Sequence, residues 1–157
     1  MERNNNMAQI NPYLQFNGNA EEAFQFYKSI FGGEFFSIMR YKDLSSTENP
    51  IGRNEGDKIM HISLPIGDNI LMASDFLETM MMGQKMENGN RYSVSISAQS
   101  KEEADRLFNE LSVGGNIEMP IGASPWGSYF AMFGDKYGIQ WIVDFDPKFN
   151  AKNNQKE

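Results

Sequence analysis

The same short pattern occurs twice along this chain, and each copy is typical of the start of a helix. Asn19 is followed three residues later by Glu22, and Ser100 is followed in the same way by Glu103. Asn and Ser are favoured N-cap residues, and a glutamate three positions further on can accept a hydrogen bond from the backbone at the cap. The repeat therefore predicts two copies of one module, with a cleft between them.

Both modules are predicted to have the element order β-α-β-β-β. Apolar residues recur at helical spacing after each cap, over 20–31 and 101–113, and Gly32-Gly33 and Gly114-Gly115 follow as helix terminators. Alternation of apolar and polar residues marks the strands. The predicted strands are 10–16, 34–41, 58–66 and 69–74 in the first module, and 91–98, 116–120, 129–134 and 139–145 in the second.

The predicted fold class is α+β, with two βαβββ modules in tandem whose curved mixed sheets surround the cleft. The modules span 9–75 and 91–147 and are joined by a methionine-rich loop, 76–90. This loop is expected to act as a lid, to form part of a subunit interface, or simply to be mobile. The polar tails, 1–8 and 148–157, are expected to be disordered.

Composition excludes several classes of function. The 157 residues include no cysteine, which rules out disulfides, zinc-thiolate sites and cysteine nucleophiles. A net charge of −7 argues against a nucleic-acid partner, because phosphate binding needs a basic face. No apolar run is long enough to cross a membrane, and the amino terminus lacks the apolar core of a signal peptide. We therefore expect a cytoplasmic protein with no membrane partner.

One face of each predicted sheet carries polar side chains. His61 and Ser63 share a face of the strand 58–66, and a row of serines lies along one face of the strand 91–98. Because the helices must cover the apolar faces, the polar faces are expected either to line the cavity or to meet solvent. The candidate ligand-binding residues are Ser63, Ser93, Ser95, Trp126, Tyr129 and Gln140.

His61 is the single histidine and the candidate catalytic residue. An imidazole on a cavity face titrates near neutrality and can move a proton, with Ser63 or Asp75 as orienting partner. The alternative is a structural hydrogen bond. Trp126, in a turn between Pro125 and Gly127, is expected at the cavity rim, whereas Trp141 is expected either in the core or against the ligand.

The two modules contain a series of short motifs: Pro12–Gly18, Ala23–Gly33, Ile59–His61, Ile70–Asp75, Pro125–Gly127, Asp135–Gly138 and Trp141. In their order and spacing these motifs resemble the vicinal oxygen chelate superfamily, which includes glyoxalase I, extradiol dioxygenases and bleomycin-resistance proteins, and within it the PhnB-like branch. The resemblance spans residues 10–145. It implies a homodimer that binds a small molecule and, if it is an enzyme, a lyase, isomerase or oxidoreductase.

The resemblance also bears on metal binding. Metal-dependent members place His, Gln or Glu ligands on the first, fourth, fifth and eighth strands. None of the matching residues here is a usable ligand, which implies that the usual metal centre is lost and that no cofactor is bound. Asp75 and Asp144 end corresponding strands; they either form a relocated site for a divalent metal or cap turns and meet solvent. The four matching residues are Pro12, Met72, Ser93 and Ile142.

Three functions follow from this reading. The first is binding of a small organic ligand in the cleft, with the reaction left open. The second is sequestration of a drug without turnover, which in an acidic protein would suit a cationic molecule. The third is a metalloenzyme with a relocated site. Some family members have been labelled demethylubiquinone methyltransferases, but no predicted strand leads into a glycine-rich cofactor loop, so we do not expect that activity.

Overall fold

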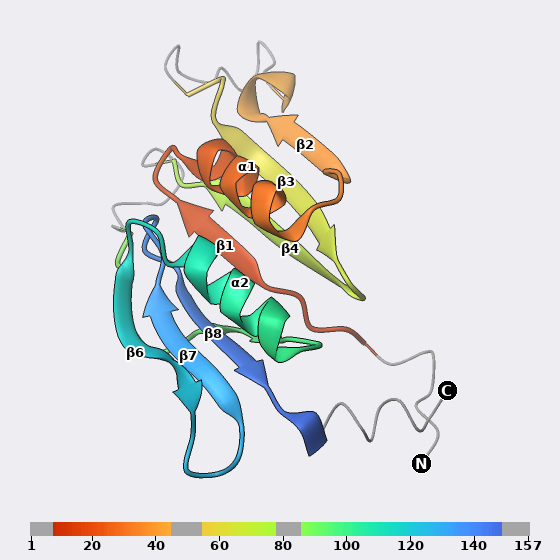
Figure 1. The fold of residues 1–157 in the computed structure, drawn as a ribbon. Coiled ribbons are helices and arrows are strands. Elements are labelled where there is room, and N and C mark those ends of the chain that lie inside the picture. Colours follow the sequence, from red (N-terminus) through yellow and green to blue (C-terminus); the bar gives the residue numbers. More distant parts are fainter. Residues whose placement is uncertain (1–7, 45–54, 78–85, 149–157) are drawn as a thin grey trace. The chain divides into compact units, whose positions relative to one another are not determined.

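The computed structural model describes residues 8–44, 55–77 and 86–148. The chain divides into two compact units, 1–86 and 87–157, and each contains a four-stranded mixed sheet and one α-helix (Figure 1). The predicted α+β fold with tandem modules is therefore confirmed. No helix in the described part of the chain is long and apolar enough to span a membrane. The predicted tails lie almost entirely outside the described residues, as does the run Met80–Met82.

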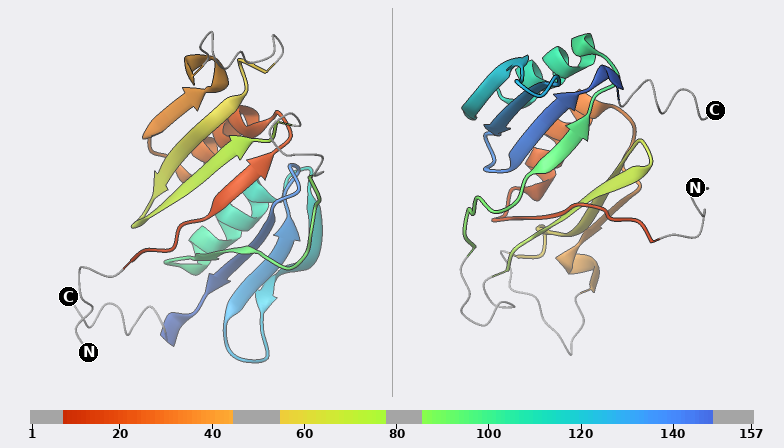
Figure 2. Two further views of the ribbon diagram at one scale, coloured as in Figure 1. Left: turned by 180° about the vertical axis from the view of Figure 1, so that it is seen from behind. Right: turned by 90° about the horizontal axis from the view of Figure 1, so that it is seen from below.

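The first module has strand order β1-β4-β3-β2, with β1 parallel to β4 and the other pairs antiparallel. Helix α1 packs across β3 and β4, as the views in Figures 1 and 2 show. The buried rings of Phe16 and Phe24 meet edge to face, with centroids 6.2 Å apart. The elements are β1 (Tyr13–Phe16), α1 (Ala20–Phe31), β2 (Ser37–Arg40), the 3-10 helix η1 (Tyr41–Leu44), β3 (Ile59–Ile66) and β4 (Asn69–Asp75).

The second module repeats this plan with strand order β5-β8-β7-β6, and α2 packs across β8 and β7. Phe108 from α2 meets Phe133 from β7 edge to face at 5.5 Å, and Trp141 and Val143 of β8 are buried beside them. The elements are β5 (Val94–Ser97), α2 (Lys101–Leu111), β6 (Asn116–Ala123), β7 (Tyr129–Gly134) and β8 (Gln140–Phe145).

The predicted element bounds differ from the observed bounds mainly at the edge strands. α1 and β7 have the predicted bounds. The edge strand β6 is longer than the predicted 116–120, whereas the edge strands β1, β2 and β5 are shorter than predicted. An edge strand pairs along one side only, so its alternating sequence continues past the last residue that has a partner.

The two helix N-termini are capped differently, and the prediction is confirmed for α2 alone. Ser100 Oγ accepts a hydrogen bond from the Glu103 amide at 3.0 Å, and the Glu103 carboxylate accepts one from the Gln99 amide at 3.1 Å. At α1 the predicted cap is wrong. The Asn19 side chain makes no cap hydrogen bond in the part of the structure described.

Asp75, at the end of β4, takes over the role predicted for Asn19. Its Oδ1 accepts from the Ala20 amide at 2.9 Å, and its Oδ2 accepts from the Ile59 amide at 2.8 Å. Asp75 is 2% exposed, and a carboxylate at a helix N-terminus also interacts favourably with the helix dipole. A tertiary contact thus replaces the local cap at α1.

Gly115 has a role that the helix-terminator interpretation missed. α2 ends at Leu111, and Gly114 has the positive φ of +74° expected after a helix. A Cβ on Gly115, however, would lie 2.0 Å from the carbonyl oxygen of Gly134. The close approach of two backbones therefore excludes any side chain at this position.

Asp135 organises the turn between β7 and β8. Its Oδ1 accepts from the amides of Tyr137 and Ile139 at 2.8 and 3.0 Å, and its Oδ2 accepts from Trp141 Nε1 at 2.8 Å. Both Asp135 and Trp141 are buried. Of the two roles considered for Trp141, the structure therefore supports a place in the core.

The difference between the two caps gives a direct test. Asp75→Ala leaves two buried amides without an acceptor and should lower the free energy of unfolding by about 3 kcal/mol. Ser100→Ala should cost about 1 kcal/mol, and Asn19→Ala less than about 0.5 kcal/mol. Urea unfolding followed by circular dichroism measures all three. Equal costs for Asn19→Ala and Ser100→Ala would contradict the assignment of the α1 cap to Asp75.

Candidate functional site

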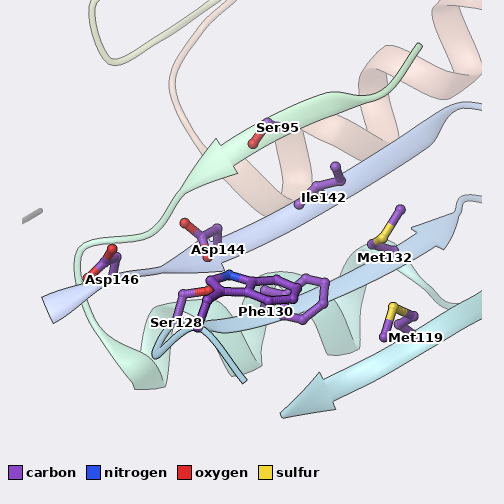
Figure 3. Close-up of a pocket in the computed structure, with 9 residues that line it drawn as sticks. Ser95, Met119, Ser128, Phe130, Met132, Ile142, Asp144 and Asp146 are labelled. Carbon is purple, nitrogen blue, oxygen red and sulfur yellow. The ribbon is translucent and has the colours of Figure 1, made fainter. Parts of the chain in front are cut away.

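A pocket of about 410 Å³ lies in the second module, on the sheet face opposite α2 (Figure 3). It lies wholly within this module, so the predicted site between the two modules stays a prediction. The lining residues come from all four strands and from the segments that follow β6 and β8. They are Ser95, Met119, Trp126, Ser128, Phe130, Met132, Ile142, Asp144 and Asp146.

Strand register explains why these side chains share one face. Phe130 is paired with Asp144, and Met132 is paired with Ile142. The residues between them along the strands, Ala131 and Val143, are buried under α2. Alternation therefore divides each strand between the helix-covered core and the open, pocket-lining face.

The loop that joins β6 to β7 forms one rim of the pocket. The Ser128 amide donates to Ser124 Oγ at 3.0 Å, the Ser124 amide donates to the Ser128 carbonyl at 2.7 Å, and Gly127 has φ of +97°. This closed turn presents Trp126, which is 69% exposed and whose ring lies 5.1 Å from that of Phe130. Trp126 thus lies at the rim of this pocket, and its predicted contact with a ligand stays a prediction.

The charged groups that line the pocket are Asp144 and Asp146, and no basic side chain is among the described lining residues. Asp146 Oδ1 accepts a hydrogen bond from the Lys148 amide at 2.9 Å. For Asp144, no side-chain hydrogen bond or ion pair occurs within the described ranges. The pocket is therefore acidic at one place and apolar over most of its floor.

The predicted ligand-binding residues separate into two groups. Ser95 and Trp126 line the pocket, whereas Ser93 and Gln140 do not. Tyr129 faces the other way, because its hydroxyl donates to the Asp105 carboxylate of α2. That hydrogen bond is the main reason why the pKa of Tyr129 is raised to about 12.

Several pocket residues were not proposed as ligand-binding from the sequence. Alternation along 129–134 and 139–145 could have placed Phe130, Met132 and Ile142 on one face. Met119 and Ser128 had no such signal, because β6 contains register shifts and Ser128 lies in a turn. Pocket-lining residues could therefore have been found from the sequence only where apolar and polar residues alternate regularly along a strand.

The open face of the first sheet holds the remaining predicted groups. The rings of His61 and Tyr13 lie 5.9 Å apart, and Ser63 pairs with Met72. Ser63 is 2% exposed, and its Oγ has no hydrogen-bond partner among residues 8–44, 55–77 and 86–148. A proton-transfer role for His61 stays a prediction.

Asp75 does not share this face with His61. Both of its carboxylate oxygens accept backbone hydrogen bonds at the start of α1 and of β3, on the helix-covered side of the sheet. This geometry accounts for Asp75 as a cap and removes it as an orienting partner for His61. Asp144 ends a corresponding strand but lies on the open face of its own sheet.

Two of the four positions that match the superfamily's metal ligands carry side chains that do not fit a metal. Met72 pairs with Tyr13 and Ser63 on the first sheet, and Ile142 pairs with Ser95 on the second. A thioether and a hydrocarbon side chain offer no ligand for a hard or borderline divalent ion. Within the described ranges, no group of three or more His, Cys, Asp or Glu side chains could hold a metal ion.

Comparison with known proteins relates this geometry to a family. Residues 8–144 match the model of the family described as 3-demethylubiquinone-9 3-methyltransferase. Protein YjdN of Escherichia coli (strain K12) is 29% identical over 142 residues, which cover 86% of this chain and 93% of that protein.

Solved structures give the same relationship. Protein PA1353 from Pseudomonas aeruginosa is 38% identical, with a TM-score of 0.77 and coverage of 89% of this chain and 98% of that chain. A putative 3-demethylubiquinone-9 3-methyltransferase, PhnB protein, from Bacillus cereus is 30% identical, with a TM-score of 0.66 and coverage of 88% and 99%. The fold is shared by a glyoxalase/bleomycin resistance protein/dioxygenase family enzyme from Burkholderia phytofirmans PsJN. That protein is 14% identical, with a TM-score of 0.56 and coverage of 85% of this chain and 95% of that chain.

The orientation of Tyr129 can be tested by its titration. The folded state favours the protonated phenol, because Asp105 accepts its proton in a hydrogen bond and repels the phenolate. The stability from this contact is therefore present below the ordinary pKa of 10.0 and is lost as pH rises through about 12. Phenolate absorbance of the wild type minus that of Tyr129→Phe should show one group titrating near pH 12.

Asp105→Asn provides the matched control and should move that titration down toward 10.0. A difference spectrum centred near pH 10 in the wild type would show instead that Tyr129 is free to face the pocket.

Proposed function

Because this chain belongs to the family described as 3-demethylubiquinone-9 3-methyltransferase, the PhnB-like branch of the vicinal oxygen chelate superfamily, we propose that it binds a small organic molecule. The proposed site is the pocket on the open face of the second sheet. The protein binds this molecule without the metal centre that other members of the superfamily use.

The pocket carries this proposal. Its volume of about 410 Å³ falls within the range of roughly 300–1,000 Å³ typical of small-molecule sites. Its lining combines aromatic and aliphatic side chains with a few polar groups, the composition that such sites usually have. Phe130 and Trp126 provide the large apolar surface, and Ser95, Ser128 and the two aspartates provide the polar groups that would orient a ligand.

One observation favours binding without turnover, the second function considered. Asp144 and Asp146 are the titratable side chains among the pocket's lining residues, and no imidazole, amine or phenol lines it in the described structure. General acid–base catalysis at neutral pH usually uses a group that titrates near that pH. Sequestration of a small molecule therefore stands as the second candidate function.

The methyltransferase name of the family does not carry over to the proposal. The loops that follow β1 and β5 are Asn17-Gly18-Asn19 and Ala98-Gln99-Ser100. Neither is a glycine-rich loop of the kind that binds a nucleotide cofactor at the start of a helix. We propose a function other than methyl transfer for this chain.

A bulky substitution tests the pocket. 4-Phenyl-1-butanol, a neutral probe, should bind to the wild type and quench or shift the fluorescence of Trp126. Ser95→Phe should weaken this binding at least tenfold because the new ring fills the pocket. Ser93→Phe is the matched control, since Ser93 is exposed on the same chain segment and does not line the pocket. Equal binding by the wild type and Ser95→Phe would contradict the proposed site.

Metal content tests the other half of the proposal. Purified protein should retain less than about a tenth of an equivalent of divalent metal after dialysis, and chelation should leave its melting temperature unchanged. Elemental analysis and thermal unfolding measure these two quantities. Stoichiometric metal that survives dialysis, with a lower melting temperature after chelation, would show that a metal centre exists.

Native mass spectrometry of the same sample reports the subunit number, for which a homodimer is the prediction.

A further inference from the structure

The polarity of the pocket changes along its length. Met119, Met132 and Ile142 are neighbours across three strands and form an apolar end. Asp146 and Ser128 lie at the opposite end, as Figure 3 shows. A ligand that fills this pocket must therefore be apolar at one end and polar at the other.

The middle of the pocket brings an aromatic ring next to a carboxylate. Phe130 and Asp144 are directly paired across β7 and β8, where side chains of an antiparallel pair lie roughly 5 Å apart at Cβ. The Trp126 ring lies 5.1 Å from that of Phe130. An ammonium group placed here would lie near a negative charge and two aromatic rings, and a carboxylate and the face of an aromatic ring both attract cations.

The electrostatics of the pocket oppose an anionic ligand. No lysine or arginine is among the described residues that line it, and the Asp144 carboxylate has no cationic partner in the described structure. Asp144 and Asp146 are partly buried, so water and salt screen their charges less than those of a fully exposed carboxylate. The net charge of −7 adds a long-range attraction for cations.

We propose that the ligand of this pocket is a small amphipathic organic cation. Its ammonium group lies between Asp144 and Asp146 beside the Trp126 and Phe130 rings, and its apolar part extends along Met132 and Ile142. This inference rests on the proposed function and adds the chemical class of the ligand. A simple amine with an aromatic or aliphatic tail has the required shape.

Three probes with the same phenyl-alkyl body separate charge from shape. They are 4-phenylbutylamine, 4-phenyl-1-butanol and 4-phenylbutyrate, which near neutral pH are a cation, a neutral molecule and an anion. Isothermal titration calorimetry at low ionic strength should give an affinity for the amine about tenfold or more above that for the alcohol, the range expected of one charge-assisted contact. The carboxylate should bind more weakly than the alcohol.

Asp144→Asn tests whether the Asp144 carboxylate causes the higher affinity for the amine than for the alcohol. It should reduce the affinity for the amine about tenfold and leave the affinity for the alcohol within twofold, because the amide keeps the shape of the side chain and removes its charge. Glu110→Gln is the control for net charge, since Glu110 lies on α2, which covers the opposite face of the sheet. It should change neither affinity by more than twofold.

The outcomes distinguish the two proposals. Equal affinities for amine and alcohol, or a preference that Asp144→Asn leaves intact, would overturn the cationic ligand while the binding pocket stands. Displacement of the amine by Mg²⁺ at equal concentration would also overturn it, because the aspartates would then be a metal site. If none of the three probes binds at millimolar concentration, both the pocket's function and its ligand class are wrong.

Discussion

Each module depends on one contact, the packing of a single amphipathic helix against one face of a four-stranded sheet. α1 covers β3 and β4, and α2 covers β7 and β8. Phe24 and Tyr27 of α1, and Leu107 and Phe108 of α2, are buried by this packing. Because the side chains of a strand alternate between its two faces, the helix covers one set of side chains and leaves the other set without a helix over it. The pocket lies on such an open face of the second sheet.

Three aspartates show how position in the fold decides what a carboxylate does. Asp75 accepts two backbone hydrogen bonds under α1, and Asp135 holds a tight turn and the indole of Trp141. Their oxygens are taken up by protein donors, so burial does not leave their charges without partners. Asp144 lies on the open face and has no such donors among the described residues. The same side chain is structural in two places and available to a ligand in the third.

Asp75 and Asp144 also show a limit of reading a repeat from sequence. The same pair, Asp-Phe, ends two segments that occupy corresponding places in the repeat, Ala73-Ser74-Asp75-Phe76 and Ile142-Val143-Asp144-Phe145. In the structure the first aspartate shares the helix-covered face with Ala73, whereas the second shares the open face with Ile142. A shift of one residue in a strand moves a side chain to the opposite face. Which face each aspartate occupies could therefore not be taken from the alignment.

The sequence by itself determined the number of modules, the order of their elements, the family, and the bounds of α1 and β7. It could do so because helical periodicity, glycine terminators and strand alternation are patterns that can be recognised within a short stretch of sequence. Only the tertiary structure decided that Asp75 caps α1 in place of Asn19, that Tyr129 faces Asp105, and that Asp144 lies beside Phe130. These outcomes depend on strand register and on contacts between residues distant in the chain, and no local pattern encodes them.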